Sequence, residues 1–178
     1  MLKKLFGSMV LAALVVSATA VPLHAQVSKG YTDIGAVIGI GGIGSASLSF
    51  GGRFEKIFKE LPDLGGGLLG IGVSADYYGY NFGSGYKLSY IPVGVTANYH
   101  FKLDYKKLDP FIGAGLGFQI VNCTGPGLGG LGCGGYNSGV YFIGRAGARY
   151  FFTPQVAGYA DVGAGAATLN LGLTFKLK

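Results

Sequence analysis

The sequence has few charged residues, and this shortage limits the kinds of protein that it can encode. Charged residues make up 12% of the 178 residues, whereas the surface of a soluble domain usually has roughly 25–35%. It has no basic helix and no stripe of basic and aromatic residues, which argues against a nucleic-acid partner. The 35 glycines follow no three-residue period, which excludes collagen, and the positive mean hydropathy argues against disorder.

The start of the chain has the layout of a secretory signal peptide. Two lysines precede an uncharged run over residues 5–20, and small residues follow this run. We expect cleavage after Ala25, with cleavage after Ala20 as the alternative. The run is short for a membrane span of about 20 residues, which disfavours an uncleaved anchor. The sequence therefore predicts an exported protein, with a signal peptide over residues 1–25 and one domain over residues 26–178.

After the signal peptide, apolar and polar side chains alternate as they do in β-strands. Eight alternating segments lie between turn signals. The predicted strands cover residues 33–41, 46–56, 67–79, 86–101, 110–122, 139–152, 155–163 and 166–177. Because the side chains of a strand point alternately to two faces, each predicted strand has one face that is apolar and uncharged along its centre and one polar face. Every connection is short enough for a hairpin, which predicts antiparallel pairing.

The polar faces of the predicted strands carry charges of both signs. Six charged residues on these polar faces are candidates for a polar network: Arg53, Glu55, Asp76, Arg145, Arg149 and Asp161. The three arginines balance the three carboxylates, as a closed polar interior requires, because a charge removed from water costs several kcal/mol unless it is paired. We therefore predict that these six side chains form a polar network inside a barrel and hold the barrel together.

The number of charges decides which face of such a barrel points outward. In a soluble barrel of the lipocalin type the apolar face lines the interior, whereas in an outer-membrane barrel it contacts lipid. Residues 26–178 have 12 basic and 8 acidic side chains, and nine of these 20 charges lie in the connections 56–63 and 102–109. Too few charges remain to cover a soluble exterior. We predict an all-β fold, an eight-stranded antiparallel up-and-down transmembrane β-barrel.

A bundle of transmembrane helices is a further alternative, because residues 34–52 are uncharged. Their glycines and their apolar period of two disfavour a helix. Phe54, Ile57, Phe58 and Leu61 fit helical spacing, which is compatible with a helical turn before Pro62.

Aromatic residues cluster near both ends of the predicted strands, as in the interfacial girdles of membrane barrels. With both chain ends in the periplasm, four predicted connections face the outside, at 42–45, 80–85, 123–138 and 164–165. Those at 57–66, 102–109 and 153–154 face the periplasm.

Three segments are similar to strands and turns of a known family: residues 110–117 (PFIGAGLG), 147–154 (GARYFFTP) and 169–175 (LNLGLTF). With them, residues 28–178 resemble the small outer-membrane β-barrels of Gram-negative bacteria, which include OmpA- and OmpX-type eight-stranded domains and opacity-type surface proteins. The resemblance implies a monomer in the cell outer membrane. It also implies two partners, the lipid bilayer and the outer-membrane assembly machinery.

Cys123 and Cys133 are the only cysteines, and both lie in the longest predicted external connection. In an exported protein such a pair predicts a disulfide, which would stabilise the fold by about 2.7 kcal/mol on the chain-entropy model. The alternatives are two free thiols, or a metal or redox site, for which a cysteine pair without a nearby histidine is weak evidence.

Other candidate chemical sites have weak support. Residues 39–44 and 125–130 match the glycine fingerprint of dinucleotide-binding proteins, but neither segment opens a helix whose amides could bind a pyrophosphate. His100, the only histidine after the signal peptide, lies on a polar face, where we expect a structural, hydrogen-bonded role. We predict no enzyme activity, no cofactor and no metal site.

The expected function follows from the size of the barrel. Eight strands enclose an interior that side chains can fill, so we expect a structural or surface-interaction role, with external loops that contact an extracellular partner. The alternative is a narrow porin-like passage or a binding cavity for a small apolar molecule; a membrane-embedded enzyme is a third. The feature that favours a passage is a set of inward glycines: Gly35, Gly39, Gly41, Gly70, Gly72, Gly94, Gly113, Gly115 and Gly117.

Overall fold

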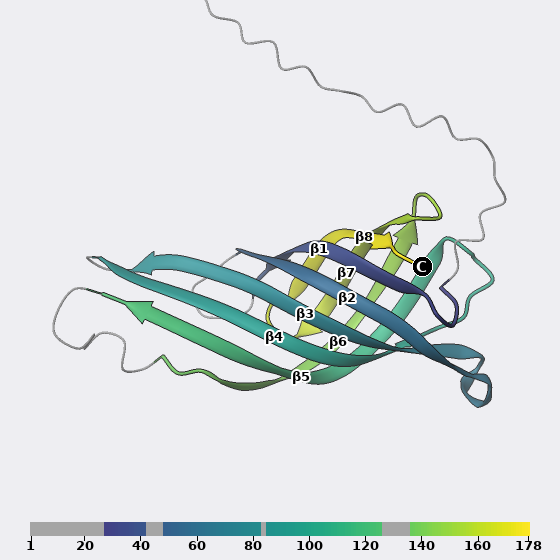
Figure 1. Ribbon diagram of the computed structural model, residues 1–178, viewed down its shortest axis with the longest axis horizontal. Coiled ribbons are helices and arrows are strands. Elements are labelled where there is room, and N and C mark those ends of the chain that lie inside the picture. The colour runs from purple at the N-terminus through teal and green to yellow at the C-terminus, as the bar shows by residue number, and fades with distance from the viewer. Residues whose placement is uncertain (1–26, 42–47, 83–84, 126–135) are drawn as a thin grey trace, which may run out of the picture.

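The computed structural model describes residues 27–41, 48–82, 85–125 and 136–178. Eight strands in these residues form one closed antiparallel barrel, in which neighbours in sequence pair and β8 pairs with β1 (Figure 1). The strands are β1 (Thr32–Ile40), β2 (Leu48–Leu61), β3 (Gly67–Phe82), β4 (Tyr86–His100), β5 (Leu108–Thr124), β6 (Gly139–Phe151), β7 (Val156–Ala164) and β8 (Leu169–Lys176). The predicted order and pairing are confirmed, and strand ends differ from the prediction by at most three residues except at the end of β2.

The end of β2 corrects the sequence-based prediction of a helical turn before Pro62. A β-bulge between Ile57 and Lys59 keeps the chain paired with β3 as far as Leu61. The only helical turn in the described residues is the 3-10 helix η1 (Pro62–Leu64), which begins at the proline. A bulge adds a residue to one strand and thereby breaks the alternation. This break produced the apolar spacing that resembles a helix.

The two faces of the sheet differ in polarity as predicted. Each strand exposes large apolar side chains on its outer face, for example Ile34, Phe50, Val73, Val95, Leu116, Phe142, Val162 and Leu173. The charged side chains of the strand centres are buried in the interior. An apolar outer wall around a polar interior is the arrangement of a transmembrane barrel, which excludes the soluble barrel and the helix bundle.

No helix in the described residues is long and apolar enough to cross a membrane.

The barrel is much taller on one side than on the other (Figure 1). β3, β4 and β5 have 16, 15 and 17 residues, whereas β7, β8 and β1 have 9, 8 and 9. Pairing of β2 with β3 ends at Tyr77, but β3 and β4 stay paired to Phe82 and Tyr86, and β5 stays paired with β4 to Thr124. We call residues 78–82, 86–90 and 121–124 the protruding sheet.

The end of the barrel that carries the first described residues and the C-terminus is called the terminal end, and the protruding sheet lies at the opposite end (Figure 1). An apolar cluster lies in the interior near each end. The cluster at the terminal end contains Val27, Tyr31, Ile57, Phe151 and Ala157. The cluster at the opposite end contains Tyr78, Leu88, Tyr90, Ala166 and Ala167. The charged groups of the interior lie between these two clusters.

Candidate functional site

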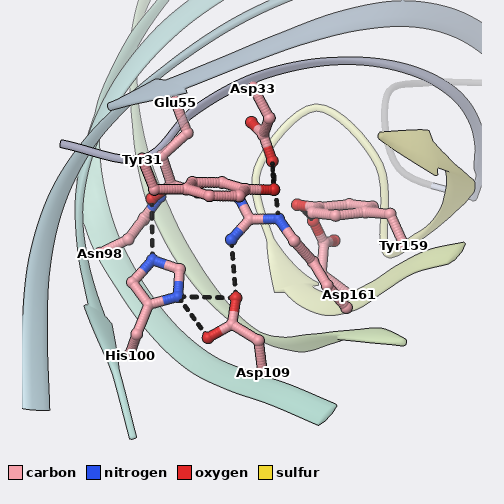
Figure 2. Close-up of polar contacts among 9 residues, drawn as sticks. Tyr31, Asp33, Glu55, Asn98, His100, Asp109, Tyr159 and Asp161 are labelled. Atoms are coloured by element: carbon pink, nitrogen blue, oxygen red, sulfur yellow. Dashed lines mark hydrogen bonds and ion pairs between the residues drawn. The ribbon is translucent and has the colours of Figure 1, made fainter. Parts of the chain in front are cut away.

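Three carboxylates from three strands surround the guanidinium of Arg149, which β6 places inside the barrel. Its Nε lies 3.0 Å from Asp33 Oδ2 on β1, and its Nη1 lies 2.9 Å from Asp109 Oδ2 on β5. Its Nη2 pairs with Glu55 Oε2 on β2. Figure 2 shows the three carboxylates around a common centre. Since only 2% of the Arg149 side chain is exposed, these ion pairs are shielded from water and link four strands.

Two aromatic rings cover the same guanidinium. The Arg149 Cζ atom lies 5.9 Å from the ring centre of Tyr31 and 5.5 Å from that of Phe111, which are cation–π distances. The Tyr31 hydroxyl donates to Asp33 Oδ2 at 3.0 Å, and Figure 2 shows the Tyr31 ring between Asp33 above it and His100 and Asp109 below it. Tyr31 also belongs to the apolar cluster at the terminal end, so its ring connects this cluster to the charged network.

His100 joins two of these carboxylates to each other. Its Nδ1 lies 2.9 Å from Asp109 Oδ1, and its Nε2 lies 3.0 Å from Glu55 Oε1 (Figure 2). A carboxylate accepts hydrogen bonds, so hydrogens on both ring nitrogens, as in the imidazolium form, satisfy both contacts. Asn98 Nδ2 donates to the same Glu55 Oε1 at 2.6 Å. The ring is buried and hydrogen-bonded, as the sequence led us to expect.

Two further ion pairs lie closer to the opposite end. Both terminal nitrogens of Arg53 donate to the two oxygens of Asp76, each at 3.1 Å. Arg145 donates to Asp161 Oδ1 and to the Ala167 carbonyl oxygen. Asp161 also accepts from the hydroxyl of Tyr159 and from Asn170 Nδ2. The structure thus brings the six predicted residues into three neighbouring groups of the same interior.

Two members of the network were not predicted. Asp109 was assigned to the connection 102–109, but it is the second residue of β5 and is buried. Asp33 was assigned to neither face and is buried on the inner face of β1, opposite Lys176 in the register. Asp109 is two residues from the inward Phe111, and Asp33 is two residues from the inward Gly35. This spacing was the sequence signal that could have placed both carboxylates inside the barrel. The interior therefore contains five carboxylates, which balance three arginines, Lys176 and an imidazolium at His100.

Little empty space remains among these groups. A cavity of about 60 Å³ is lined by residues that include Arg53, Asp76, Tyr141 and Arg145. Since a water molecule needs about 10–15 Å³ on this measure, the cavity has room for a few waters. Sites for drug-sized ligands usually measure about 300–1,000 Å³. Most of the residues that line it are polar or charged, although apolar side chains such as Phe111 and Ile143 also contribute.

The inward glycines are covered by neighbouring atoms. A Cβ atom at Gly94 would lie 2.5 Å from Ile143 Cδ1, and one at Gly35 would lie 2.8 Å from Thr174 Cγ2. Comparable overlaps would occur at Gly39, Gly70, Gly72, Gly113, Gly115 and Gly117. Real Cβ atoms do not approach other atoms so closely, so eight of the nine glycines provide room for side chains or backbone of adjacent strands.

On the protruding sheet, the outer face changes from apolar to polar. Tyr77, Ile91 and Ile120 are the last large apolar side chains on the outer faces of β3, β4 and β5 before the protruding sheet. A hollow of about 360 Å³ lies beyond them, and the polar residues that line it are Asn81, Lys87, Ser89, Asn122 and Thr124. Sequence analysis had treated residues 80–85 as a connection and so missed this surface.

Some predicted features lie outside the described residues. These are the signal peptide, Cys133, residues 42–44 of the first glycine-rich fingerprint and residues 126–130 of the second. Cys123 lies near the end of β5, opposite Leu88 of β4. The disulfide therefore stays a prediction. No group of three or more His, Cys, Asp or Glu side chains in the described parts of the chain is arranged to hold a metal ion.

Comparisons with known proteins identify the fold. No protein-family model matches the sequence, and no curated protein matches it. A designed transmembrane β-barrel has a TM-score of 0.52 with 15% identity, over 85% of this chain and 99% of that chain. Ail, the attachment invasion locus protein of Yersinia pestis, solved in complex with the heparin analogue sucrose octasulfate, has a TM-score of 0.51 with 12% identity, over 84% and 96%.

A third solved structure, the N-terminal β-barrel domain of Pseudomonas aeruginosa OprF, has a TM-score of 0.49 with 19% identity, over 84% of this chain and 98% of that chain. The structural neighbour Ail is a small eight-stranded outer-membrane β-barrel, which matches the resemblance inferred from the sequence. At these identities the likeness concerns the fold, whose environment is a lipid bilayer.

Proposed function

We propose that the protein is a monomeric barrel of the cell outer membrane, exported by its signal peptide and inserted by the outer-membrane assembly machinery. Its role is structural or in surface interaction, without enzyme activity. The terminal end lies in the periplasm, and the protruding sheet lies outside the cell. The observation that carries this proposal is the protruding sheet. A strand that only spans the bilayer can end where its apolar outer face ends, whereas β3, β4 and β5 continue beyond this point with a polar outer face.

The dimensions of the protruding sheet support a contact surface. From Tyr77 to Phe82 the chain advances five residues, which corresponds to about 16 Å at 3.2–3.4 Å per residue of strand. Hydrogen bonding to β4 holds β3 over this whole length, and β4 holds β5 to Thr124. A paired sheet presents side chains in fixed positions. Binding to this sheet therefore costs less conformational entropy than binding to a loose loop, which would have to become ordered.

The packing of the interior supports a filled lumen. Eight of the nine inward glycines are covered by neighbours, the cavity beside Arg53 and Arg145 is about 60 Å³, and an apolar cluster lies near each end. These observations disfavour the passage and the apolar binding cavity, which the inward glycines had favoured at the level of sequence. A catalytic role has no support from the site, where each charged group is engaged by an opposite charge.

Planar-bilayer recording tests the filled lumen. We expect folded protein to show conductance near zero, because Arg149 and its three carboxylate partners lie almost fully buried across the interior. The same sample should show a heat-dependent shift of mobility in detergent gels, which reports a closed barrel. Steady single-channel conductance from protein that shows this shift would contradict the filled lumen and restore the passage as the better function.

Lysine labelling on intact cells tests the orientation of the barrel. Lys87 is the single lysine of the protruding sheet, and the connections at that end contain none. A membrane-impermeant amine reagent should therefore modify Lys87 in intact cells, and the lysines of the terminal end only after permeabilisation. The matched control is Lys87→Arg, which keeps the charge and should abolish labelling of intact cells. Labelling of terminal-end lysines in intact cells would reverse the proposed orientation.

Binding by the protruding sheet is tested with folded protein in nanodiscs on arrays of saccharides and extracellular-matrix proteins. Asn122→Lys and Ser89→Lys place bulky charges in the hollow and should abolish binding, whereas Lys106→Gln at the terminal end should leave it unchanged. The neighbour Ail was solved with a highly sulfated ligand, but the protruding sheet has one basic residue, so we expect no polyanion to bind there. Binding that is unchanged by both Asn122→Lys and Ser89→Lys would count against this surface as the binding site.

A further inference from the structure

Charges outside the barrel interior are distributed unevenly along the barrel axis. At the terminal end there are seven basic and three acidic side chains, a net charge of +4: Lys29, Lys56, Lys59, Lys102, Lys106, Lys107 and Lys178, against Glu60, Asp63 and Asp104. At the opposite end Lys87 is the one charged residue, and residues 41–47, 83–85, 125–138 and 163–168 contain none. We call the seven lysines of the terminal end the lysine rim.

Part of the lysine rim lies on the lipid-facing wall. In the register, Lys56 is opposite Ile71 and Lys59 is opposite Leu69, and Ile71 is 47% exposed on the outer face of β3. Both lysines are exposed. Their neighbours in β2 include Phe54 and Phe58, which are 40% and 42% exposed. A lysine in such a position extends its aliphatic stem along the apolar wall and places its ammonium group at the level of the lipid headgroups.

The β4–β5 connection repeats this arrangement. Phe101, Leu103 and Tyr105 are 42%, 38% and 55% exposed, and they alternate with Lys102, Asp104 and Lys106. Exposed apolar and aromatic side chains next to lysines are typical of segments that lie at a membrane interface. A segment that faced only water would gain nothing from exposing three large apolar side chains.

A hollow at the terminal end lies between lysines from different segments. It measures about 180 Å³, and its lining includes Lys29, Lys102, Lys106 and Glu60, together with the apolar Leu68 and Leu103. Lys102 Nζ lies 3.7 Å from Glu60 Oε1, and both side chains are more than half exposed, so this pair is weak and leaves a net positive charge at the hollow. The combination suits a phosphate group attached to an apolar chain.

We propose that the lysine rim binds the headgroup phosphates of anionic phospholipids, of the phosphatidylglycerol type, in the leaflet at the terminal end. A soluble anion would not explain the lysines on the lipid-facing wall of β2, and a lipid explains both these lysines and their apolar neighbours. Anionic headgroups attract basic residues close to the membrane surface, and the attraction falls off within a Debye length. The inference rests on the proposed membrane location, but not on the surface role of the protruding sheet.

The test measures lipid selectivity with spin-labelled lipids. The full barrel is refolded into phosphatidylcholine vesicles, and electron spin resonance compares how much spin-labelled phosphatidylglycerol and phosphatidylcholine is motionally restricted at the protein surface. We expect a preference for phosphatidylglycerol of about fivefold at low salt, the size expected for a single lysine near an anionic surface. It should approach one in about 1 M salt, where the Debye length is about 3 Å.

Matched variants locate the preference on the barrel. Replacing Lys56, Lys59, Lys102 and Lys106 together with glutamine should bring the preference close to one, whereas Lys87→Gln should leave it unchanged. Asp63→Asn combined with Asp104→Asn removes the acidic neighbours and should increase it. A preference near one in the wild type, or one that survives the fourfold substitution, would overturn the proposal.

The heat-dependent mobility shift of each sample keeps loss of folding distinct from loss of selectivity. Failure of this proposal would leave the saccharide-array and conductance results untouched, so it is distinguishable from failure of the proposed function.

Discussion

Replacing Arg149 with methionine should destabilise the barrel more than any other single substitution in the polar network. Methionine retains much of the side-chain volume but removes the cation that Asp33, Glu55 and Asp109 share. These carboxylates are 1%, 4% and 6% exposed, so water cannot replace the lost partner. Removing one member of a buried ion pair typically costs about 3–5 kcal/mol. We expect the upper part of this range, because Asp33 loses its arginine and Glu55 and Asp109 keep only His100 as a shared cationic partner.

The size of the effect can be separated from a general loss of packing by matched variants. Arg53→Met removes a cation with one carboxylate partner and a side chain that is 14% exposed, so we expect a smaller loss, about 3 kcal/mol or less. Combining Arg149→Met with Asp33→Asn and Glu55→Gln should recover part of the lost stability, since fewer unpaired charges stay buried.

The assay is reversible unfolding by denaturant in lipid vesicles, followed by circular dichroism and by heat-dependent mobility in gels. A loss below about 1 kcal/mol for Arg149→Met, or no difference from Arg53→Met, would refute the argument that shared burial of charge sets the cost. A triple variant that is no more stable than Arg149→Met would refute the charge explanation as well.

Three further predictions concern the wall, the glycines and the cysteines. Val95→Arg places a charge on the lipid-facing wall, where Val95 is 55% exposed, and should cost about 2–4 kcal/mol in the same unfolding assay; an unchanged midpoint would mean that this face does not contact lipid. Gly115→Ala should lower the free energy of unfolding by about 1–3 kcal/mol, because a Cβ atom there would meet the Val95 carbonyl oxygen. The control Gly144→Ala should cost much less, because no atom lies near its Cβ position. Equal costs for the two variants would argue against a packed interior. Cys123 and Cys133 should resist alkylation until a reductant is added, which mass spectrometry detects; alkylation of both cysteines in unreduced exported protein would exclude the disulfide.

Most of the fold could be predicted because strand alternation is a local property. In β4, for example, Val93, Val95 and Ala97 point outward and Thr96 and Asn98 inward, as their spacing of two requires. The end of β2 could not be predicted in the same way, because the bulge after Ile57 changes the phase of the alternation and leaves a spacing that fits a helix.

The candidate site was predictable in part. Arg145 and Arg149 stand out in an otherwise uncharged strand, and Glu55, Asp76 and Asp161 share the inner faces of theirs. Asp109 was missed because its sequence neighbours are charged turn residues. Alternation with Phe111 was the one local signal for its inward direction, and its partner Arg149 is 40 residues away in sequence, so only the pairing of β5 with β6 brings the two together.

The sequence by itself determined that one face of every strand is apolar and uncharged along the centre of the strand, and that few charges lie at the protruding end while lysines dominate the terminal end. These features depend only on residue types and on the period of a strand. Which carboxylate pairs with which arginine was decided by the tertiary structure, since Glu55 meets Arg149 across 94 residues and only after the barrel closes. Closure of the barrel also determined whether the inward glycines leave empty space. A strand in isolation has no side chain at Gly94, whereas in the closed barrel Ile143 occupies the space next to it.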